Sequence, residues 1–255
     1  MRSKFVKASN VKRLLSGVSA LEKRGALEAC IMVVDGVPGL GKTRSIRNFV
    51  VETGSLYVRA KTEQSANWLL GEMLRELDET PPHSRERKYD KLAEALARES
   101  HKAQLEGRSF ALVVDEGDAI SRNGKLLETI RDLSDDTEVP TIIVGMRTIN
   151  DNLKRFPAFS SRVSQRVTFQ PATLEDVRLL FAELCEVSVG DDVCKYIHKF
   201  SGGYNREVVD AIAKVERVAK RLEINGDAIA LSDLSGHAIM QDRNTSKPIT
   251  VPEVI

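Results

Sequence analysis

The 255-residue sequence predicts an α/β protein, with a five-stranded parallel sheet flanked by helices and a small C-terminal helical lid domain. Three observations support this fold class. Short apolar runs alternate with stretches of helical periodicity, which is typical of a parallel sheet covered by helices. The apolar runs are continuous rather than alternating, as in strands buried on both faces. After Pro171 only helical patterns remain.

Strand-like and helical segments alternate along the first two thirds of the chain. The predicted strands are Cys30–Val34, Leu56–Val58, Phe110–Val114, Thr141–Val144 and Val167–Phe169. The helical stretches between them are Arg44–Val51, Gln64–Leu77, His83–Leu105 and Asn123–Leu133. Apolar residues recur in these stretches at intervals of three and four, which places them on one helix face. The same period predicts the later helices Leu174–Val187, Asp191–Phe200, Arg206–Leu222 and Leu231–Met240.

This order divides the chain into four parts. A basic N-terminal helical segment (1–25) precedes the α/β domain (26–170), and the helical lid (171–240) follows it. The last residues, 241–255, contain two prolines and few large apolar side chains, so we expect a flexible tail.

Composition excludes several classes of protein. The net charge of +1 excludes a histone-like polycation, and 5% aromatic residues are too few for a base-stacking platform. No apolar run approaches the ~18 residues of a membrane helix, and we expect a cytoplasmic protein without a membrane partner. The three cysteines lack a C-x-x-C spacing and the four histidines are scattered, which predicts no zinc site. Seven of the first 24 residues are basic and one is acidic, so a near-neutral chain can still carry a basic face.

The segment 36–43 reads GVPGLGKT, a complete phosphate-binding loop pattern between a predicted strand and a predicted helix. Glycines let backbone N–H groups curl around a phosphate chain, and the helix N-terminus adds a positive dipole. Lys42 is expected to reach the β- and γ-phosphates of ATP, and Thr43 to ligate Mg²⁺. The predicted cofactor-binding residues are Gly36, Val37, Pro38, Gly39, Leu40, Gly41, Lys42, Thr43, Arg44 and Asp115.

Two carboxylates end the predicted strand at residues 110–114. Asp115 is expected to hold Mg²⁺ together with Thr43, and Glu116 to polarise the attacking water as general base. A phosphate loop and a carboxylate pair at strand ends predict an ATPase.

With these motifs in order, the chain resembles the AAA+ ATPases over roughly residues 10–240. Further matches are the strand at 141–145, the Ser-Arg before the fifth strand and the G-G-x-x-R at 202–206. The resemblance implies an oligomer with ATP between neighbouring subunits. By position, Arg162 looks like the arginine finger, with Arg166 and Arg155 as alternatives, and Arg206 looks like sensor 2. The usual polar sensor-1 residue is absent directly after Gly145. Either Arg147 or Thr148 takes its place, or hydrolysis is slow.

Within that family the chain is similar to the MuB/TnsC group of transposition regulators. This resemblance implies a protein that polymerises with ATP on double-stranded DNA, selects the insertion target and recruits or activates a transposase. It also implies a DNA-associated place in a bacterial or phage-infected cell. The expected DNA contacts are Arg59, Lys61, Thr62, Arg85, Arg87 and Lys88. Two alternatives remain open, a replication initiator or helicase-loader-type ATPase, and a protein-binding ATPase switch without DNA. A filament and a ring also remain open.

Overall fold

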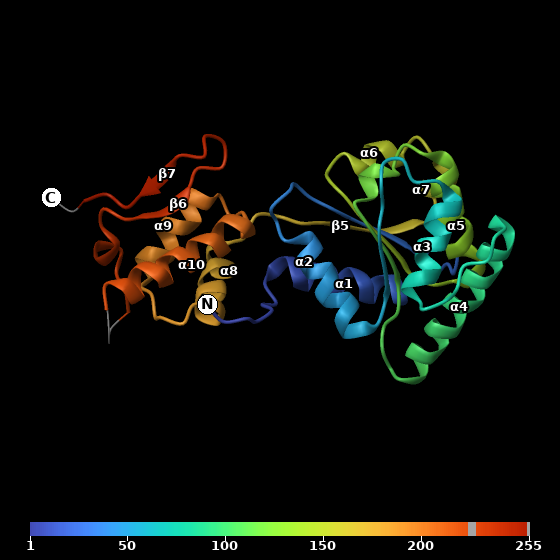
Figure 1. Cartoon of the computed structure of the whole chain (residues 1–255), viewed down its shortest axis with the longest axis horizontal. Helices are drawn as coiled ribbons and strands as arrows, with labels where there is room; N and C mark the ends of the chain where they lie inside the picture. The colour runs from blue at the N-terminus through green and yellow to red at the C-terminus, as the bar shows by residue number, and fades with distance from the viewer. Residues whose placement is uncertain (224–227, 254–255) are drawn as a thin grey trace. The chain divides into compact units, whose positions relative to one another are not determined.

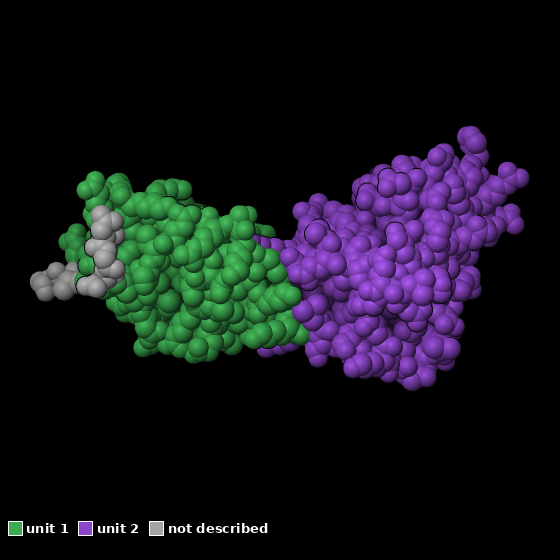
Figure 2. Space-filling view, turned by 90° about the horizontal axis from the view of Figure 1, so that it is seen from below, with its two compact units in different colours: residues 1–12, 38–41, 170–255 green, residues 13–37, 42–169 purple. Residues whose placement is uncertain are grey.

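The computed structural model describes residues 1–223 and 228–253, which form two compact units (Figure 2). The α/β unit contains residues 13–37 and 42–169. The lid unit contains residues 1–12 and 38–41 and the chain from Gln170 onward. The structure confirms the predicted fold class, and each unit has its own core.

Five strands and seven α-helices belong wholly or partly to the α/β unit (Figure 1). The strands are β1 (Ile31–Asp35), β2 (Leu56–Arg59), β3 (Leu112–Asp115), β4 (Thr141–Val144) and β5 (Val163–Thr168). The helices are α1 (Ser9–Glu22), α2 (Lys42–Thr53), α3 (Ala66–Glu76), α4 (Arg85–Leu105), α5 (Gly124–Thr137), α6 (Ile149–Leu153) and α7 (Pro157–Ser160), with the 3₁₀ turn η1 (Gly117–Ala119). Side-chain caps start several helices, as where Ser65, Ser84 and Asn123 accept a backbone N–H.

The strand order is β2-β3-β4-β1-β5, and every pairing in this sheet is parallel. The chain therefore moves across the sheet in one direction from β1 to β2 and in the opposite direction from β2 to β5. Right-handed crossovers then place α2 on one face and α3, α4 and α5 on the other, as Figure 1 shows. The carboxyl ends of β1, β3 and β4 meet at one edge, where ligands of open α/β sheets bind.

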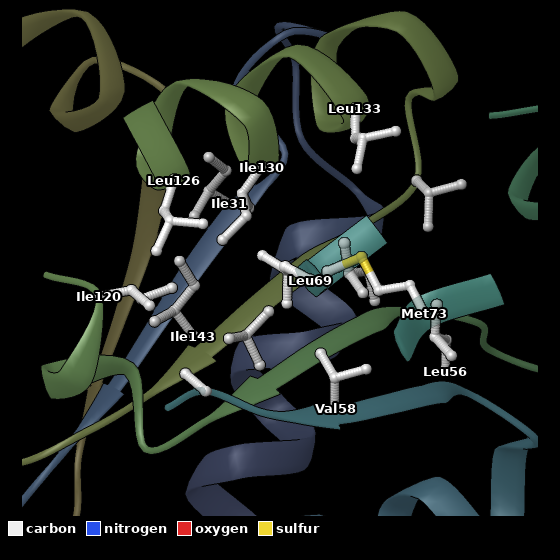
Figure 3. Packing of buried hydrophobic residues seen from close by; sticks show 14 of the residues in the cluster. Ile31, Leu56, Val58, Leu69, Met73, Ile120, Leu126, Ile130, Leu133 and Ile143 are labelled. Carbon is white, nitrogen blue, oxygen red and sulfur yellow. The ribbon is translucent and has the colours of Figure 1, made fainter. Parts of the chain in front are cut away.

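The larger core lies between the sheet and helices α3, α4 and α5. Leu126, Ile130 and Leu133 of α5 belong to one cluster with Ile31 of β1 and Ile143 of β4, and Figure 3 shows Leu126 and Ile130 beside Ile31. All five side chains are essentially inaccessible to solvent. Truncating such a side chain to alanine costs about 2–5 kcal/mol of folding free energy, so this core holds the site-bearing strand ends in place.

The described residues of the lid unit form three main helices and a short hairpin. Its elements are α8 (Leu174–Leu184), α9 (Asp191–Ser201), α10 (Asn205–Arg221), η2 (Leu231–Leu234), β6 (Ala238–Gln241) and β7 (Pro248–Thr250). Within the described part of the chain, no helix combines the length and apolarity of a membrane span.

The C-terminal part of the lid unit differs from the sequence-based prediction. The predicted helix Leu231–Met240 is wrong, because the segment forms η2 and then strand β6. Gly236, with a φ of +72°, lies between them and ends the helical turn. The predicted flexible tail contributes β7, which pairs antiparallel with β6, while Val251 is buried in the lid core. Residues 254–255 of that predicted tail lie outside the described residues.

Candidate nucleotide-binding site

The phosphate loop joins the end of β1 to the start of α2. Gly36, Gly39 and Gly41 all have positive φ angles, of 148°, 96° and 88°. Side chains with a Cβ rarely adopt this backbone conformation, so the three glycines are required for the curl of the loop. Helix α2 begins at Lys42, which places the helix N-terminus directly behind the loop. This is an anion-binding arrangement.

The ammonium group of Lys42 folds back over the loop. Its Nζ donates hydrogen bonds to the carbonyl oxygens of Gly36 and Val37, the second at 3.1 Å. Burial lowers the pKa of Lys42 below its ordinary value, and nearby carboxylates led by Asp118 and Asp115 oppose this shift. Lys42 is therefore a partly desolvated cation among acids, which suits it to a phosphate chain.

Asp115 ends β3 and is fixed by two hydrogen bonds. Its Oδ2 accepts from the hydroxyl of Tyr57 at 2.9 Å, and its Oδ1 accepts from the backbone N–H of Glu116 at 2.8 Å. Burial and the Asp115 charge raise the pKa of Tyr57, so this phenol remains a donor at neutral pH. A buried, oriented carboxylate of this kind is a suitable oxygen ligand for Mg²⁺. Sequence reasoning missed Tyr57, although parallel pairing of β2 with β3 would have pointed to it.

Glu116 is exposed and adopts a left-handed conformation, with φ 55° and ψ 37°. Such a conformation is strained for a residue other than glycine and occurs preferentially at functional sites. Its Oε1 accepts a hydrogen bond from Nη2 of Arg59 at 3.1 Å. Arg59, which the sequence assigns to DNA, thus lies beside the expected general base.

The two candidates for sensor 1 differ in their surroundings. Thr148 donates from Oγ1 to Oδ1 of Asp118 at 3.2 Å, and the N–H of Met146 donates to the other oxygen of the same carboxylate. Arg147 is exposed to solvent. Thr148 therefore belongs to the carboxylate group around Lys42, through Asp118.

Asp35 and Asn150 form a part-buried polar pair that sequence reasoning missed. The Nδ2 of Asn150 donates to Oδ2 of Asp35, while Oδ1 of each residue is buried without a hydrogen-bond partner. Asp35 also lies close enough to Lys42 to favour its charged form. An acidic residue at the end of β1, directly before the loop, was the available signal.

The three candidates for the arginine finger lie near the start of β5. Nε of Arg162 forms an ion pair with Asp135 of α5, at 3.0 Å from both carboxylate oxygens, and its side chain is one-third exposed. Arg155, after α6, and Arg166, on β5, are exposed. Arg162 thus has an intramolecular partner in Asp135.

In the lid unit, residues that open α10 contact the tip of the phosphate loop. The N–H of Arg206 donates to the carbonyl of Gly39 at 3.1 Å, and Nδ2 of Asn205 donates to the carbonyl of Leu40 at 3.0 Å. The side chain of Arg206 is exposed. Gly203 has a φ of +74°, and a Cβ there would lie 2.5 Å from a carbonyl oxygen, which explains the glycine before the helix.

The residues expected to contact DNA lie in two places. One group is at the end of β2 and in the loop that leads to α3, and the other is at the start of α4. Lys61 pairs with Glu72 and lies 4.8 Å from the centre of the Trp68 ring. Lys88 of α4 donates to Oδ1 of Asn67 of α3 at 2.8 Å, which brings the two helix starts together. Thr62 and Arg87 are exposed, and Arg85 donates to the Thr129 hydroxyl at 3.1 Å.

Comparisons with known proteins agree with this geometry. A family model described as an AAA domain matches residues 27–153. The ATP-dependent target DNA activator B proteins of Escherichia phage Mu and Escherichia phage D108 are each 26% identical to the chain over 184 residues. These alignments cover 69% of this chain and 55% of each relative, so the chain spans about half the length of the curated relatives it matches.

Solved structures show the same fold. Cdc6p from Pyrobaculum aerophilum superimposes with a TM-score of 0.58 at 18% identity, covering 91% of this chain and 68% of its own. The Aeropyrum pernix Orc1 protein in complex with DNA gives 0.55 at 16%, covering 87% and 62%. A Thermotoga maritima RuvB mutant gives 0.53 at 20%, covering 88% and 67%. With its phosphate loop and strand-end carboxylates, the region that matches the family model is an AAA ATPase domain, and the chain is similar to the phage target DNA activators.

Proposed function

We propose that this ATPase binds double-stranded DNA without sequence preference when ATP is bound, oligomerises on it as a helical filament, and selects the target for a transposase that it recruits or activates. Slow hydrolysis then drives disassembly, inside a bacterial or phage-infected cell. The observation that carries the proposal is the similarity to two proteins named ATP-dependent target DNA activators. The chain covers about half of each, so activity on DNA needs its own test.

The proposed roles at the nucleotide follow from the donor chemistry. The loop N–H groups and Lys42 bind the phosphates, and Glu116 accepts a proton from the attacking water. Thr43 and Asp115 offer hydroxyl and carboxylate oxygens, the ligands that Mg²⁺ prefers. When bound there, Mg²⁺ neutralises charge on the phosphates. Arg162 is proposed to act on a neighbour's ATP, and Arg206 on that of its own subunit.

The proposed DNA surface consists of Arg59, Lys61, Thr62, Arg85, Arg87 and Lys88. The contact between Lys88 and Asn67 supports one continuous basic surface over the starts of α3 and α4. Lys61 is paired with Glu72, but both partners are partly exposed. Exposed ion pairs contribute only about 0–1 kcal/mol, so a DNA phosphate can compete for Lys61.

The test is retention on non-specific duplex DNA with ATP, ADP or no nucleotide, across a salt series. We expect binding with ATP only and a steep loss of affinity with salt, since each phosphate contact adds about 0.9 to the logarithmic slope. Lys61→Glu is expected to weaken binding and reduce that slope by about 1. Lys102→Glu, which changes an exposed lysine at the other end of α4, is the matched control and is expected to bind as wild type does.

Each alternative has its own outcome. Preference for single strands would favour a loader-type protein, and absence of DNA binding under all conditions would favour a protein-binding switch.

Electron microscopy with ATP and duplex DNA tests the assembly. Helical filaments are expected, and closed rings would contradict that part of the proposal.

A further inference from the structure

Three consecutive carbonyl oxygens at the tip of the phosphate loop accept hydrogen bonds from the rest of the lid unit. Nη2 of Arg243 donates to Pro38 at 2.9 Å. As described above, the N–H of Arg206 and Nδ2 of Asn205 donate to the next two carbonyls. Neither the sequence pattern nor the family resemblance assigns a role to Arg243.

These bonds orient the loop because of peptide geometry. In a trans peptide, the C=O of one residue and the N–H of the next point in opposite directions. Holding the carbonyls of Pro38, Gly39 and Leu40 toward the lid residues therefore turns the N–H groups of Gly39, Leu40 and Gly41 the other way. Those N–H groups are the ones expected to surround phosphate oxygens.

Arg243 reaches Pro38 from the turn between β6 and β7. The carboxylate of Asp242 holds this turn by accepting from the N–H groups of Asn244 at 3.0 Å and Thr245 at 2.7 Å. These bonds lower the pKa of Asp242. The backbone at Asp242 also pairs with Lys247 at 2.8 Å. The turn is thus a defined platform for the Arg243 side chain.

The guanidinium of Arg243 is fixed on three sides. Nη1 donates to Oε1 of Glu207 at 2.8 Å, Nη2 donates to the carbonyl of Pro38, and Cζ lies over the Tyr204 ring, 4.0 Å from its centre. A Cβ at Gly39 would lie 2.9 Å from Nη1, so the guanidinium lies directly against the backbone of the loop. A planar, forked and stacked cation fits this place, and a lysine cannot make all three contacts.

We propose that Arg243 is a positioning residue for nucleotide binding, which orders the phosphate loop from the C-terminal hairpin. This inference rests on the nucleotide binding of the proposed function and is independent of DNA. It makes the hairpin a support for residues 38–41 of the phosphate loop. By linkage, a partner that displaces the hairpin would weaken ATP binding, and ATP would weaken that partner's binding by the same factor.

Calorimetric titration of ATP and ADP tests the proposal with three variants. Arg243→Ala is expected to weaken both nucleotides about tenfold, the value of one charge-assisted hydrogen bond. The two losses are expected to be equal, because Arg243 contacts the loop and not the γ-phosphate. Arg243→Lys is expected to lie between Arg243→Ala and wild type. Lys247→Ala removes a positive charge from the same turn and is expected to bind as wild type does.

Several outcomes would overturn the inference. Wild-type affinities in folded Arg243→Ala would show that the contact does not order the loop. If the alanine variant does not fold, wild-type affinities in Arg243→Lys would show the same. A loss confined to ATP would make Arg243 a γ-phosphate sensor instead. If wild type itself binds neither nucleotide, the proposed function fails as well, whereas equal binding by wild type and variants overturns this inference alone.

Discussion

Arg59 and Glu116 form an ion pair at the adjacent ends of β2 and β3. The strand register sets Arg59 opposite Asp115, so its side chain meets the next residue, Glu116. The pair occupies one carboxylate oxygen of the expected general base. Because Arg59 directly precedes the loop with Lys61, a DNA phosphate bound there as proposed would also compete for the Arg59 guanidinium.

We therefore expect Arg59→Ala to raise ATP turnover in the absence of DNA, because Glu116 is released to accept the proton of water. Turnover with DNA is expected to change little, so the ratio of the two rates falls toward one. Steady-state phosphate release measures both. Glu116→Gln is the reference, with ATP binding retained and turnover reduced about 10²–10⁴-fold in both conditions. A fall in DNA-free turnover of Arg59→Ala would mean that Arg59 activates Glu116.

At the scale of the element, Asp176 joins the N-terminal segment to α8 within the lid unit. Its Oδ1 accepts from the N–H and the hydroxyl of Ser9, at 2.9 and 2.8 Å, where α1 begins. Its Oδ2 accepts from the N–H of Thr173, and Thr173 in turn caps α8. Burial alone would raise the pKa of Asp176, but these hydrogen bonds outweigh it and lower the pKa.

A lowered pKa makes this cap a pH-dependent stabiliser. The ionised form contributes stability above its unfolded pKa of about 3.9, and the contribution disappears as pH falls through the lower folded pKa. Asp176→Asn is expected to lower the free energy of unfolding by about 1–3 kcal/mol at pH 7. The difference from wild type is expected to shrink below about pH 4.

Urea unfolding of both proteins between pH 7 and pH 3 measures this difference. Asp90→Asn, at an exposed carboxylate on α4, is the control and is expected to match wild type throughout. A difference between Asp176→Asn and wild type that stays constant down to pH 3 would mean that the charge of Asp176 contributes nothing.

At the scale of the whole molecule, activity is expected to depend on neighbouring subunits. A single chain supplies the phosphate loop and the carboxylates, whereas the arginine finger is proposed to act on the ATP of a neighbouring subunit. In the isolated chain Arg162 is paired with Asp135, and Arg155 and Arg166 are exposed. A neighbour's γ-phosphate is expected to replace Asp135, because a guanidinium binds phosphate through the same paired N–H bonds as carboxylate.

Arg162→Ala is therefore expected to bind ATP normally and to lose turnover in the assembly. An arginine finger contributes about 10³–10⁵ in rate. Lys42→Ala keeps the finger but loses the phosphate contact. Mixing the two variants is expected to restore part of the ATPase activity, provided that nucleotide-free subunits are incorporated. Arg162 of a Lys42→Ala subunit can then act on the ATP bound by a neighbouring Arg162→Ala subunit. Wild-type turnover by Arg162→Ala alone would transfer the role to Arg166 or Arg155.

Local sequence determined the strands, most of the helices and the core of the nucleotide site. The phosphate loop and the pair Asp115–Glu116 are contiguous motifs, and the backbone conformations they require depend on residues a few positions apart. The prediction of a helix at residues 231–240 was wrong because these residues have a helical apolar spacing. Strand β7, which pairs with β6, lies further along the chain.

Only the tertiary structure decided which distant side chains meet at the site. Tyr57 binds Asp115 across 58 residues, Asn150 binds Asp35 across 115, and Arg243 binds Pro38 across 205. Such pairs depend on strand order, register and the packing of two separate cores, none of which a local pattern encodes. The sequence by itself therefore determined the chemistry of the loop and its carboxylates, and the fold selected the residues that orient them.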